Sequence, residues 1–114
     1  MEKKRPEFDP DHGADNRPVL ACPACGFGFM HQCGVEVFSR DEEDSETGQH
    51  VSVNHGEQAS VTNVVTTAEG NPSRRRDGIK IKFWCEDCRN KESPYELVIR
   101  QHKGNEHMFW LLDT

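Results

Sequence analysis

The chain has 114 residues, of which 33% are hydrophobic and 30% charged, and its formal net charge at pH 7 is −6. This length fits one domain, and so few apolar residues build only a small core, which favours a bound metal as an additional source of stability. The acidic balance argues against a general DNA-binding protein, because affinity for phosphates needs a dense positive field. No segment approaches the roughly 20 apolar residues that span a bilayer, so we expect no membrane insertion.

Residues 1–18 combine many charged side chains with Pro6, Pro10, Pro18 and Gly13. This composition is typical of a solvated chain, so we expect a disordered tail at 1–18 and a single domain at 19–114. The first residues lack the apolar stretch of a secretory signal, and the chain contains five cysteines. Together these features indicate a reducing compartment, and we expect a cytoplasmic protein.

The first half of the expected domain begins with a tight turn, Cys22-Pro23-Ala24-Cys25-Gly26. Residues 27–40 then predict one strand, or two short strands interrupted at Gly34, with Val35 and Val37 on one side and Glu36 and Phe38 on the other. The acidic segment 41–48 predicts an exposed turn. β-branched residues at 50–55 and 59–67 predict a hairpin.

The second half contains the clearest strand, 79–84, in which Ile79, Ile81 and Phe83 alternate with lysines and should face the core. This strand runs directly into Cys85-Glu86-Asp87-Cys88. Residues 95–101 and 106–112 predict a closing hairpin around Gly104, and residues 87–93 have room for one short helical turn. The expected fold is therefore mainly β: an antiparallel sheet of about five to six strands, closed by a four-cysteine site that resembles a zinc ribbon.

Four of the cysteines form two C-x-x-C pairs, and such pairs can surround one tetrahedral Zn²⁺ with four thiolates: Cys22, Cys25, Cys85 and Cys88. We expect one structural zinc per chain, without which the protein should loosen or unfold. Rubredoxin-type iron sites also use two such pairs, but the second pair here lacks the usual Pro and Gly. A thioredoxin-like redox pair is disfavoured because no βαβ pattern follows either pair.

The remaining candidate ligands are weaker. Cys33, two residues after His31, is interpreted as a small half-buried hydrophobe rather than a reactive thiol. His102 and His107 should lie close together across the last turn, but no third ligand has a suitable spacing. Catalytic triads, phosphate-binding loops and H-E-x-x-H motifs are missing from the sequence, so we do not expect an enzyme.

Two surface features suggest partners. A basic and aromatic group could hold phosphates and stack a base, although a solvated loop and strand face is the favoured interpretation: Arg74, Arg75, Arg76, Lys80, Lys82 and Trp84. The acidic turn at 41–46 could mimic a phosphate backbone, but a solvated turn is the simpler interpretation. The apolar strand Met108–Leu112 could pair edge to edge in a homodimer, or simply pack in the core.

Three segments carry a resemblance to a known group of proteins: Cys22 to Gly26, Ser73 to Cys88, and Ile99 to Gly104 with Trp110. Across residues 19–112 the chain resembles small uncharacterised zinc-ribbon proteins of bacteria and their phages or mobile elements. The resemblance implies the zinc ligands and implies no activity. We expect a non-enzymatic protein-interaction module, acting as an adaptor or regulator, with a nucleic-acid-binding zinc ribbon as the alternative.

Overall fold

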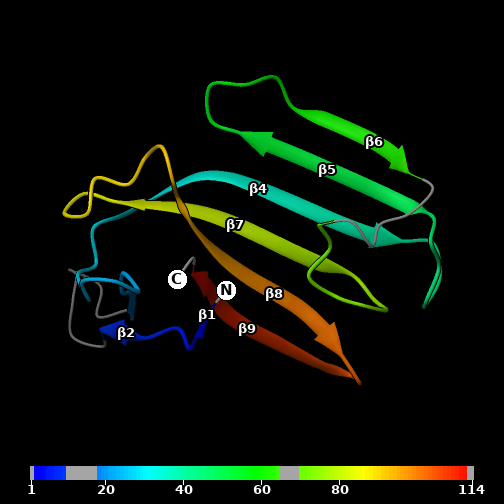
Figure 1. Ribbon diagram of the computed structural model, residues 1–114, viewed down its shortest axis with the longest axis horizontal. Coiled ribbons are helices and arrows are strands. Elements are labelled where there is room, and N and C mark those ends of the chain that lie inside the picture. The colour runs from blue at the N-terminus through cyan, green and yellow to red at the C-terminus, as the bar shows by residue number, and fades with distance from the viewer. Residues whose placement is uncertain (1, 10–17, 65–69, 113–114) are drawn as a thin grey trace.

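The computed structural model describes residues 2–9, 18–64 and 70–112, and in these ranges it contains nine strands and no helix (Figure 1). The strands are β1 (Glu2–Lys4), β2 (Phe8–Asp9), β3 (Val19–Leu20), β4 (Met30–Arg40), β5 (Gly48–Asn54), β6 (Ser60–Val64), β7 (Gly78–Cys85), β8 (Tyr95–His102) and β9 (Asn105–Leu112). Seven of them form one antiparallel sheet in the order β1-β9-β8-β7-β4-β5-β6, and β2 pairs with β3. A mainly β, antiparallel fold is therefore confirmed.

The strands predicted from periodicity correspond to β4 through β9, and the seventh strand of the sheet is β1. The predicted strand at 59–67 is described as far as Val64, and its residues 65–67 lie outside the described part. The interruption expected near Gly34 is a bulge between Gln32 and Gly34 within a continuous β4. A Cβ atom on Gly34 would lie 2.7 Å from Asn54 Oδ1 and 3.2 Å from the Val53 carbonyl oxygen, so β5 approaches this glycine closely. The short helical turn expected at 87–93 is a run of hydrogen-bonded turns instead.

The N-terminal segment pairs in two places. Glu2–Lys4 add to the outer side of β9, with Lys4 opposite Trp110, and Phe8–Asp9 pair with Val19–Leu20. Residues 10–17 of the expected tail lie outside the described residues. Strand addition is made by backbone hydrogen bonds, so a charged and proline-containing composition does not reveal it.

The alternation of the strands gives the sheet two different faces. On one face, directly paired residues form two apolar rows across the strands. One row contains Val53, Val35, Ile81, Leu97 and Trp110, and the other contains Val61, Val51, Val37, Ile79, Ile99 and Met108. The opposite face has the lysines of β7 together with Phe38 and Val98. The predicted alternation of β7 is confirmed, because Ile79 and Ile81 lie on the apolar face and the lysines lie on the other. Phe83 is buried.

The main core lies at the end of the sheet nearest the cysteines. Trp110 is fully buried and meets Phe83 edge to face, with ring centroids 5.6 Å apart. Leu97 completes this cluster, and Leu20 of β3 and Met30 of β4 pack against it. The core therefore sits between the apolar face of the sheet and the segment that carries the first cysteine pair.

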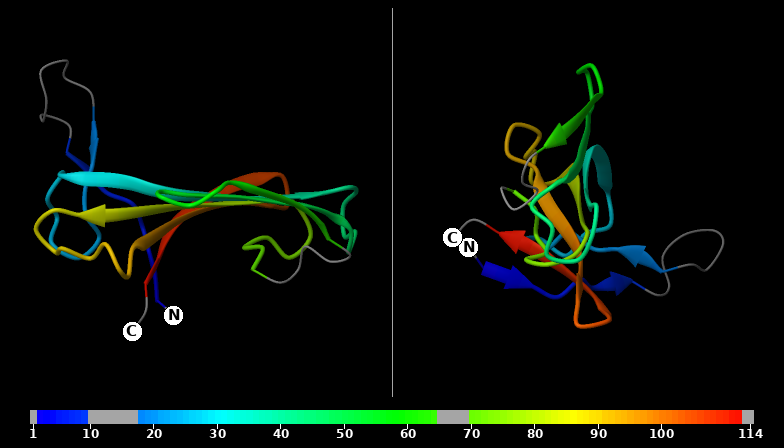
Figure 2. Two further views of the ribbon diagram at one scale, coloured as in Figure 1. Left: turned by 90° about the horizontal axis from the view of Figure 1, so that it is seen from above. Right: turned by 90° about the vertical axis from the view of Figure 1, so that its right-hand side faces the viewer.

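One end of the opposite face is covered by the loop that precedes β7. Phe38 is only 2% exposed, and Gly70 of this loop approaches its ring. Phe38 lies on the side of β4 opposite Val35 and Val37, as predicted, and it is buried because the loop gives this face a small core of its own. Figure 2 shows the loop on one side of the sheet, at the end opposite β2 and β3.

Candidate metal centre

The two C-x-x-C segments fold into nearly equivalent turns. The Gly26 amide donates to the Cys22 carbonyl at 3.0 Å, and the Arg89 amide donates to the Cys85 carbonyl at 2.8 Å. Gly26 and Arg89, each directly after the second cysteine of its pair, both have positive φ, at 81° and 52°. The first turn satisfies this requirement with glycine, whereas the second places a bulky residue in the left-handed region.

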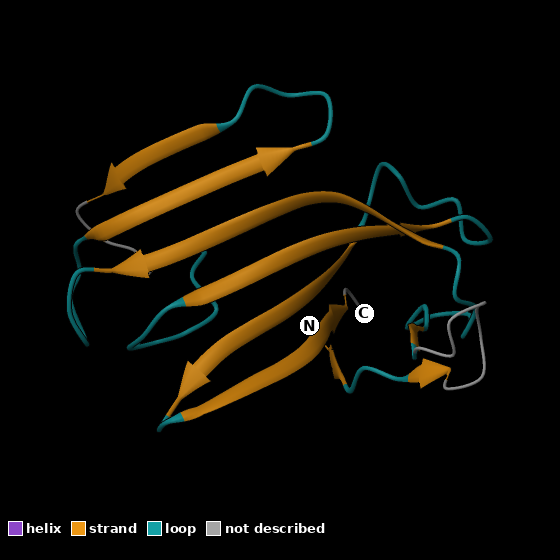
Figure 3. Cartoon of the chain, turned by 180° about the vertical axis from the view of Figure 1, so that it is seen from behind, coloured by secondary structure: helices purple, strands orange, loops and turns teal. Residues whose placement is uncertain are grey.

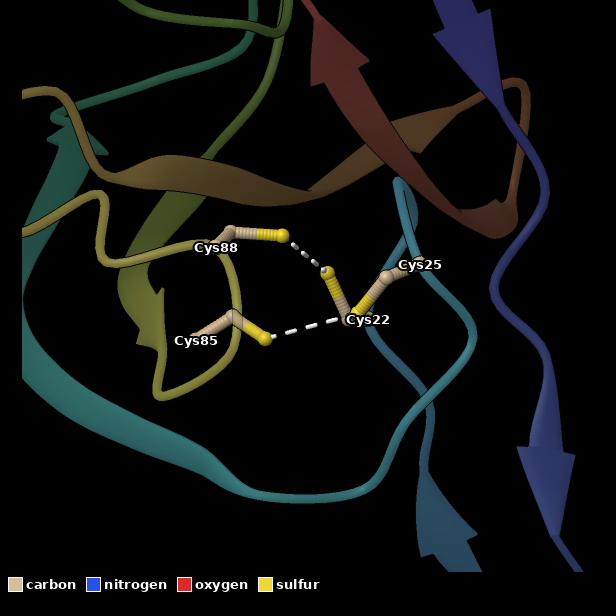
Figure 4. A group of neighbouring side chains, drawn as sticks. All are labelled: Cys22, Cys25, Cys85 and Cys88. Carbon is tan, nitrogen blue, oxygen red and sulfur yellow. Dashed lines mark hydrogen bonds between the residues drawn. The ribbon is translucent and has the colours of Figure 1, made fainter.

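The four sulfur atoms meet in one cluster (Figure 4). The Sγ atoms of Cys22 and Cys88 are 3.8 Å apart, those of Cys25 and Cys85 are 3.6 Å apart, and all four lie within 4.8 Å of one another. Four sulfurs bound to a tetrahedral ion at about 2.3 Å would be separated by about 3.8 Å. The predicted ligands thus have the spacing of a metal site.

The long segment between the two pairs is what brings them together. β4 begins a few residues after the first pair and runs antiparallel to β7, so that Met30 lies opposite Cys85. The Glu86 amide also donates to the Phe29 carbonyl at 3.1 Å. The strands β4 to β6 therefore form an insertion between the two pairs, and β7 returns the chain to the first cysteine pair.

The four cysteines are buried to different degrees. Cys22 and Cys85 are buried, Cys88 is half-buried and Cys25 is exposed. Burial raises the pKa of the Cys22 thiol, although the amides of Cys25 and Ala24 donate to its sulfur and oppose this effect. Burial also acts to raise the pKa of Cys85, but hydrogen bonds from the Cys88 and Asp87 amides and from neighbouring thiols outweigh it, and the pKa is lowered.

Two residues that sequence reasoning missed support the cluster. The Tyr95 hydroxyl donates to Cys88 Sγ, and burial together with this bond raises the Tyr95 pKa. Asn90 Oδ1 accepts from the buried Cys85 amide at 2.7 Å, while its Nδ2 donates to the Ser93 carbonyl at 3.3 Å. An asparagine shortly after a cysteine pair is a recognisable turn signal, but Tyr95 reaches the site only because β8 pairs with β7.

The other candidate ligands lie outside this cluster. Cys33 is half-buried at the β4 bulge, and burial raises the pKa of its thiol although nearby Lys82 opposes this. The His102 and His107 rings are 5.6 Å apart, as their spacing predicted. Within residues 2–9, 18–64 and 70–112, however, the four cysteines are the single group of three or more potential ligands that converge.

Two arginines of the predicted basic group, Arg75 and Arg76, are paired with the predicted acidic turn. Arg75 makes a bidentate contact with Asp44 at 2.8 and 2.9 Å and a further contact with Glu43, which also binds Arg76. The Asp44 amide donates to the Arg75 carbonyl at 2.9 Å. Arg75 and Arg76 are therefore neutralised by Glu43 and Asp44, although the two charge runs lie about 30 positions apart in the chain.

The rest of the basic group lies along β7 on the face opposite the apolar rows. Lys80 Nζ lies 5.6 Å from the centre of the Phe38 ring, and Lys82 Nζ donates to Asn54 Oδ1 at 3.2 Å. The Trp84 ring stacks with His31 at 4.2 Å, and Lys91 Nζ lies 4.4 Å from its centre. A nucleobase would compete with these two side chains for the indole.

No protein-family model matches the chain, and comparisons with curated proteins and with solved structures gave no match. Among the described residues, no helix is long and apolar enough to cross a membrane. The thiol cluster and the two faces of the sheet are therefore the features from which a function can be inferred.

Proposed function

We propose that this protein is a small, non-enzymatic β domain held together by one structural zinc ion, and that it acts by binding another protein. The observation that carries the zinc assignment is the cluster of four cysteine sulfurs at the separations of a tetrahedral ion. Four protein thiolates fill all four positions around zinc and leave none for a water or a substrate, which is the pattern of a structural site rather than a catalytic one. Thiols kept for a metal also fit a reducing, cytoplasmic environment.

A structural role follows from where the cluster lies. The first cysteine pair continues β3, whose Leu20 packs on the core around Trp110, and the second pair ends β7, the strand that contributes Phe83. One ion would tie these two parts of the core together. Structural zinc contributes on the order of 10 kcal/mol near neutral pH, which is comparable to the whole stability of a small domain.

A protein partner is favoured by the surface of the sheet. Apolar side chains are exposed on it, including Val61 at 66%, Val53 at 43% and Met108 at 44%. Exposed apolar patches of this kind typically mark contact with other macromolecules through burial of hydrocarbon. The nucleic-acid alternative has less support, because Arg75 and Arg76 are neutralised by acidic side chains and Trp84 is already in contact with His31 and Lys91.

The zinc proposal is tested by elemental analysis of the purified protein and by Cys85→Ser, with Cys33→Ser as the matched control. We expect one zinc per chain in the wild type and in the control. We expect Cys85→Ser to lose the metal and its cooperative thermal transition, and chelation of the wild type to do the same. Protein that contains no transition metal and keeps its fold in chelator would refute the proposal, and a coloured, iron-containing preparation would replace zinc by iron.

The choice between a protein and a nucleic-acid partner is tested by salt titration of binding to single-stranded and duplex DNA and RNA. We expect no tight binding at physiological salt. Tight binding that falls steeply as salt is added, and that is abolished when Arg74, Arg75 and Arg76 are all changed to alanine, would favour the nucleic-acid alternative.

A further inference from the structure

The strand β6 (Ser60–Val64) is the outermost strand at one margin of the seven-stranded sheet (Figure 3). It pairs with β5 on one side, and no strand of the described residues lies on its other side. A strand in this position presents a row of backbone N–H and C=O groups away from the sheet. Such groups form strong hydrogen bonds, and the geometry that satisfies all of them together is that of another extended chain.

The margin formed by β5 and β6 carries no formal charge. The seven residues of β5 and the five of β6 include no Asp, Glu, Lys or Arg, although 30% of the whole chain is charged. β6 also contains no proline, and Ser60, Val61 and Thr62 are exposed. Natural edge strands are usually protected from pairing by lysines, other charges or prolines. Because β6 has none of these, it is suited to receive another strand.

The opposite margin of the sheet has the usual protection. β1 pairs with Trp110–Leu112 of β9, and all three of its residues, Glu2–Lys4, are charged. This pairing also opposes the edge-to-edge homodimer considered for Met108–Leu112, because β1 already lies against three of those five residues. The contrast between the two margins singles out β6.

We propose that β6 binds an extended segment of a partner protein, which adds to the sheet as one further strand. This inference rests on the protein-binding role proposed above and names the kind of segment that is bound. In this mode of recognition, hydrogen bonds between main chains supply the affinity and alternate side chains supply the specificity.

The side chains of β6 define the sequence that fits. Val61 is 66% exposed and lies at the end of the apolar row that continues through Val51 and Val37. A β-branched residue beside Val61 would extend this row, because such cross-strand pairs stabilise neighbouring strands. Ser60 and Thr62 point to the other face, where small polar residues fit. The bound segment should therefore alternate aliphatic and polar residues.

The net charge of the chain favours a different protein over a second copy. Each copy carries a formal charge of −6, and like net charges oppose the association of two copies. A segment of a neutral or basic protein meets no such repulsion. We therefore expect the bound segment to lack Asp and Glu.

The test uses a fluorescein-labelled synthetic peptide with the sequence of residues 49–53, Gln-His-Val-Ser-Val. In the fold these side chains already fit β6, with Val51 opposite Val61 and His50 opposite Thr62. Binding to the full, zinc-loaded chain is followed by fluorescence anisotropy and by amide NMR. Two further peptides carry backbone N-methyl groups on one or the other set of alternate residues, because a methyl group replaces the amide hydrogen that a strand donates.

We expect the unmodified peptide to bind with a dissociation constant below about 1 mM and to shift the amide resonances of Ser60–Val64. One of the two N-methylated peptides has its methyl groups on the edge that faces β6. We expect this peptide to bind at least about fivefold more weakly than the other, since it loses its hydrogen bonds to the strand.

The protein variant is Val61→Lys, and the matched control is Gln58→Lys in the turn before β6. Both positions are exposed, and both changes add one positive charge. Val61→Lys should weaken binding of the unmodified peptide about twofold to fivefold, because it replaces an aliphatic cross-strand pair. The control should bind the peptide like the wild type. Retained zinc and circular dichroism check that each variant folds.

Four results would overturn the inference: no binding at about 1 mM peptide, equal binding of the two N-methylated peptides, equal effects of the two lysine variants, or a homodimer in sedimentation that Val61→Lys dissociates. Any of these results with a folded chain that holds one zinc would leave the zinc site and a protein partner on another surface in place. Tight binding of nucleic acid that weakens steeply with salt would instead refute the protein-binding role itself.

Discussion

Arg40 is expected to hold the loop before β7 in place, and Arg40→Ala should therefore destabilise the protein strongly. The Arg40 guanidinium donates to four backbone carbonyls: Nε to Arg76 at 3.0 Å, Nη1 to Ser45 at 2.6 Å, and Nη2 to Ser73 and Arg74 at 3.1 Å each. It thereby joins the acidic turn to the loop that covers Phe38. No other side chain among the described residues makes as many hydrogen bonds to the backbone.

The expected loss follows from these bonds. Hydrogen bonds from a charged donor contribute about 1.5–3 kcal/mol each, but they are not additive, and Arg40 is half-buried, so water would replace part of the loss. We estimate a decrease of about 2–4 kcal/mol in the free energy of unfolding. For a domain of this size, that decrease lowers the Tm by at least about 8 °C.

The assay is urea or thermal unfolding of the zinc-loaded protein, with Arg74→Ala as the control. Arg74 is exposed and also carries one positive charge, so its removal should change stability by less than about 0.5 kcal/mol. Hydrogen exchange provides a second measurement, because the Arg76 amide, which donates to Ser73 Oγ at 2.9 Å, should lose protection in Arg40→Ala. Equal stability of the two variants would refute the reasoning.

Three further changes test individual contacts. Tyr95→Phe removes the hydroxyl donor to the thiol cluster while keeping the ring, and should weaken zinc binding by about tenfold in a competition with a chelating dye; unchanged affinity would contradict this role. Asn90→Ala leaves the buried Cys85 amide without its acceptor and should lower the free energy of unfolding by about 1–3 kcal/mol in urea titrations. If the free energy of unfolding does not change measurably, water replaces the side chain as acceptor. The hydrogen bond from Arg75 and the positive charge of Arg75 lower the pKa of Asp44 below its ordinary value of 3.8. The pair therefore contributes fully to stability at a pH above that ordinary value, and its contribution is lost as the pH falls through the lowered pKa. In a carboxyl NMR titration, Arg75→Ala should return the Asp44 pKa towards its ordinary value, and no change would show that the pair is not formed in solution.

The metal cluster was the most predictable part of the site, because its signal is local. A C-x-x-C pair sets the distance between two sulfurs within one turn, so Cys22, Cys25, Cys85 and Cys88 can be recognised without knowing how the chain returns. The strands β4 to β9 were equally accessible, since alternation with a period of two residues is a property of consecutive residues.

The features that the sequence did not reveal depend on contacts between distant segments. The basic group read from residues 74–84 is divided, because Arg75 meets Asp44 across the loop while Trp84 lies beside His31 at the other end of β7. Phe38 is buried because Gly70 and its loop cover it. Which distant residues come into contact depends on the path of the chain, and no pattern of neighbouring residues specifies that path.

The sequence by itself determined the candidate ligands, the strands and the alternation of side chains, because each depends on spacing along the chain. Only the tertiary structure decided which charges neutralise each other, that β1 covers the edge of β9, and which half of the apolar rows is buried under Leu20. The physical reason is that these outcomes come from the order of the strands in the sheet and from the layers above and below it. An apolar row looks the same in sequence whether its second layer is supplied by the same chain or by another.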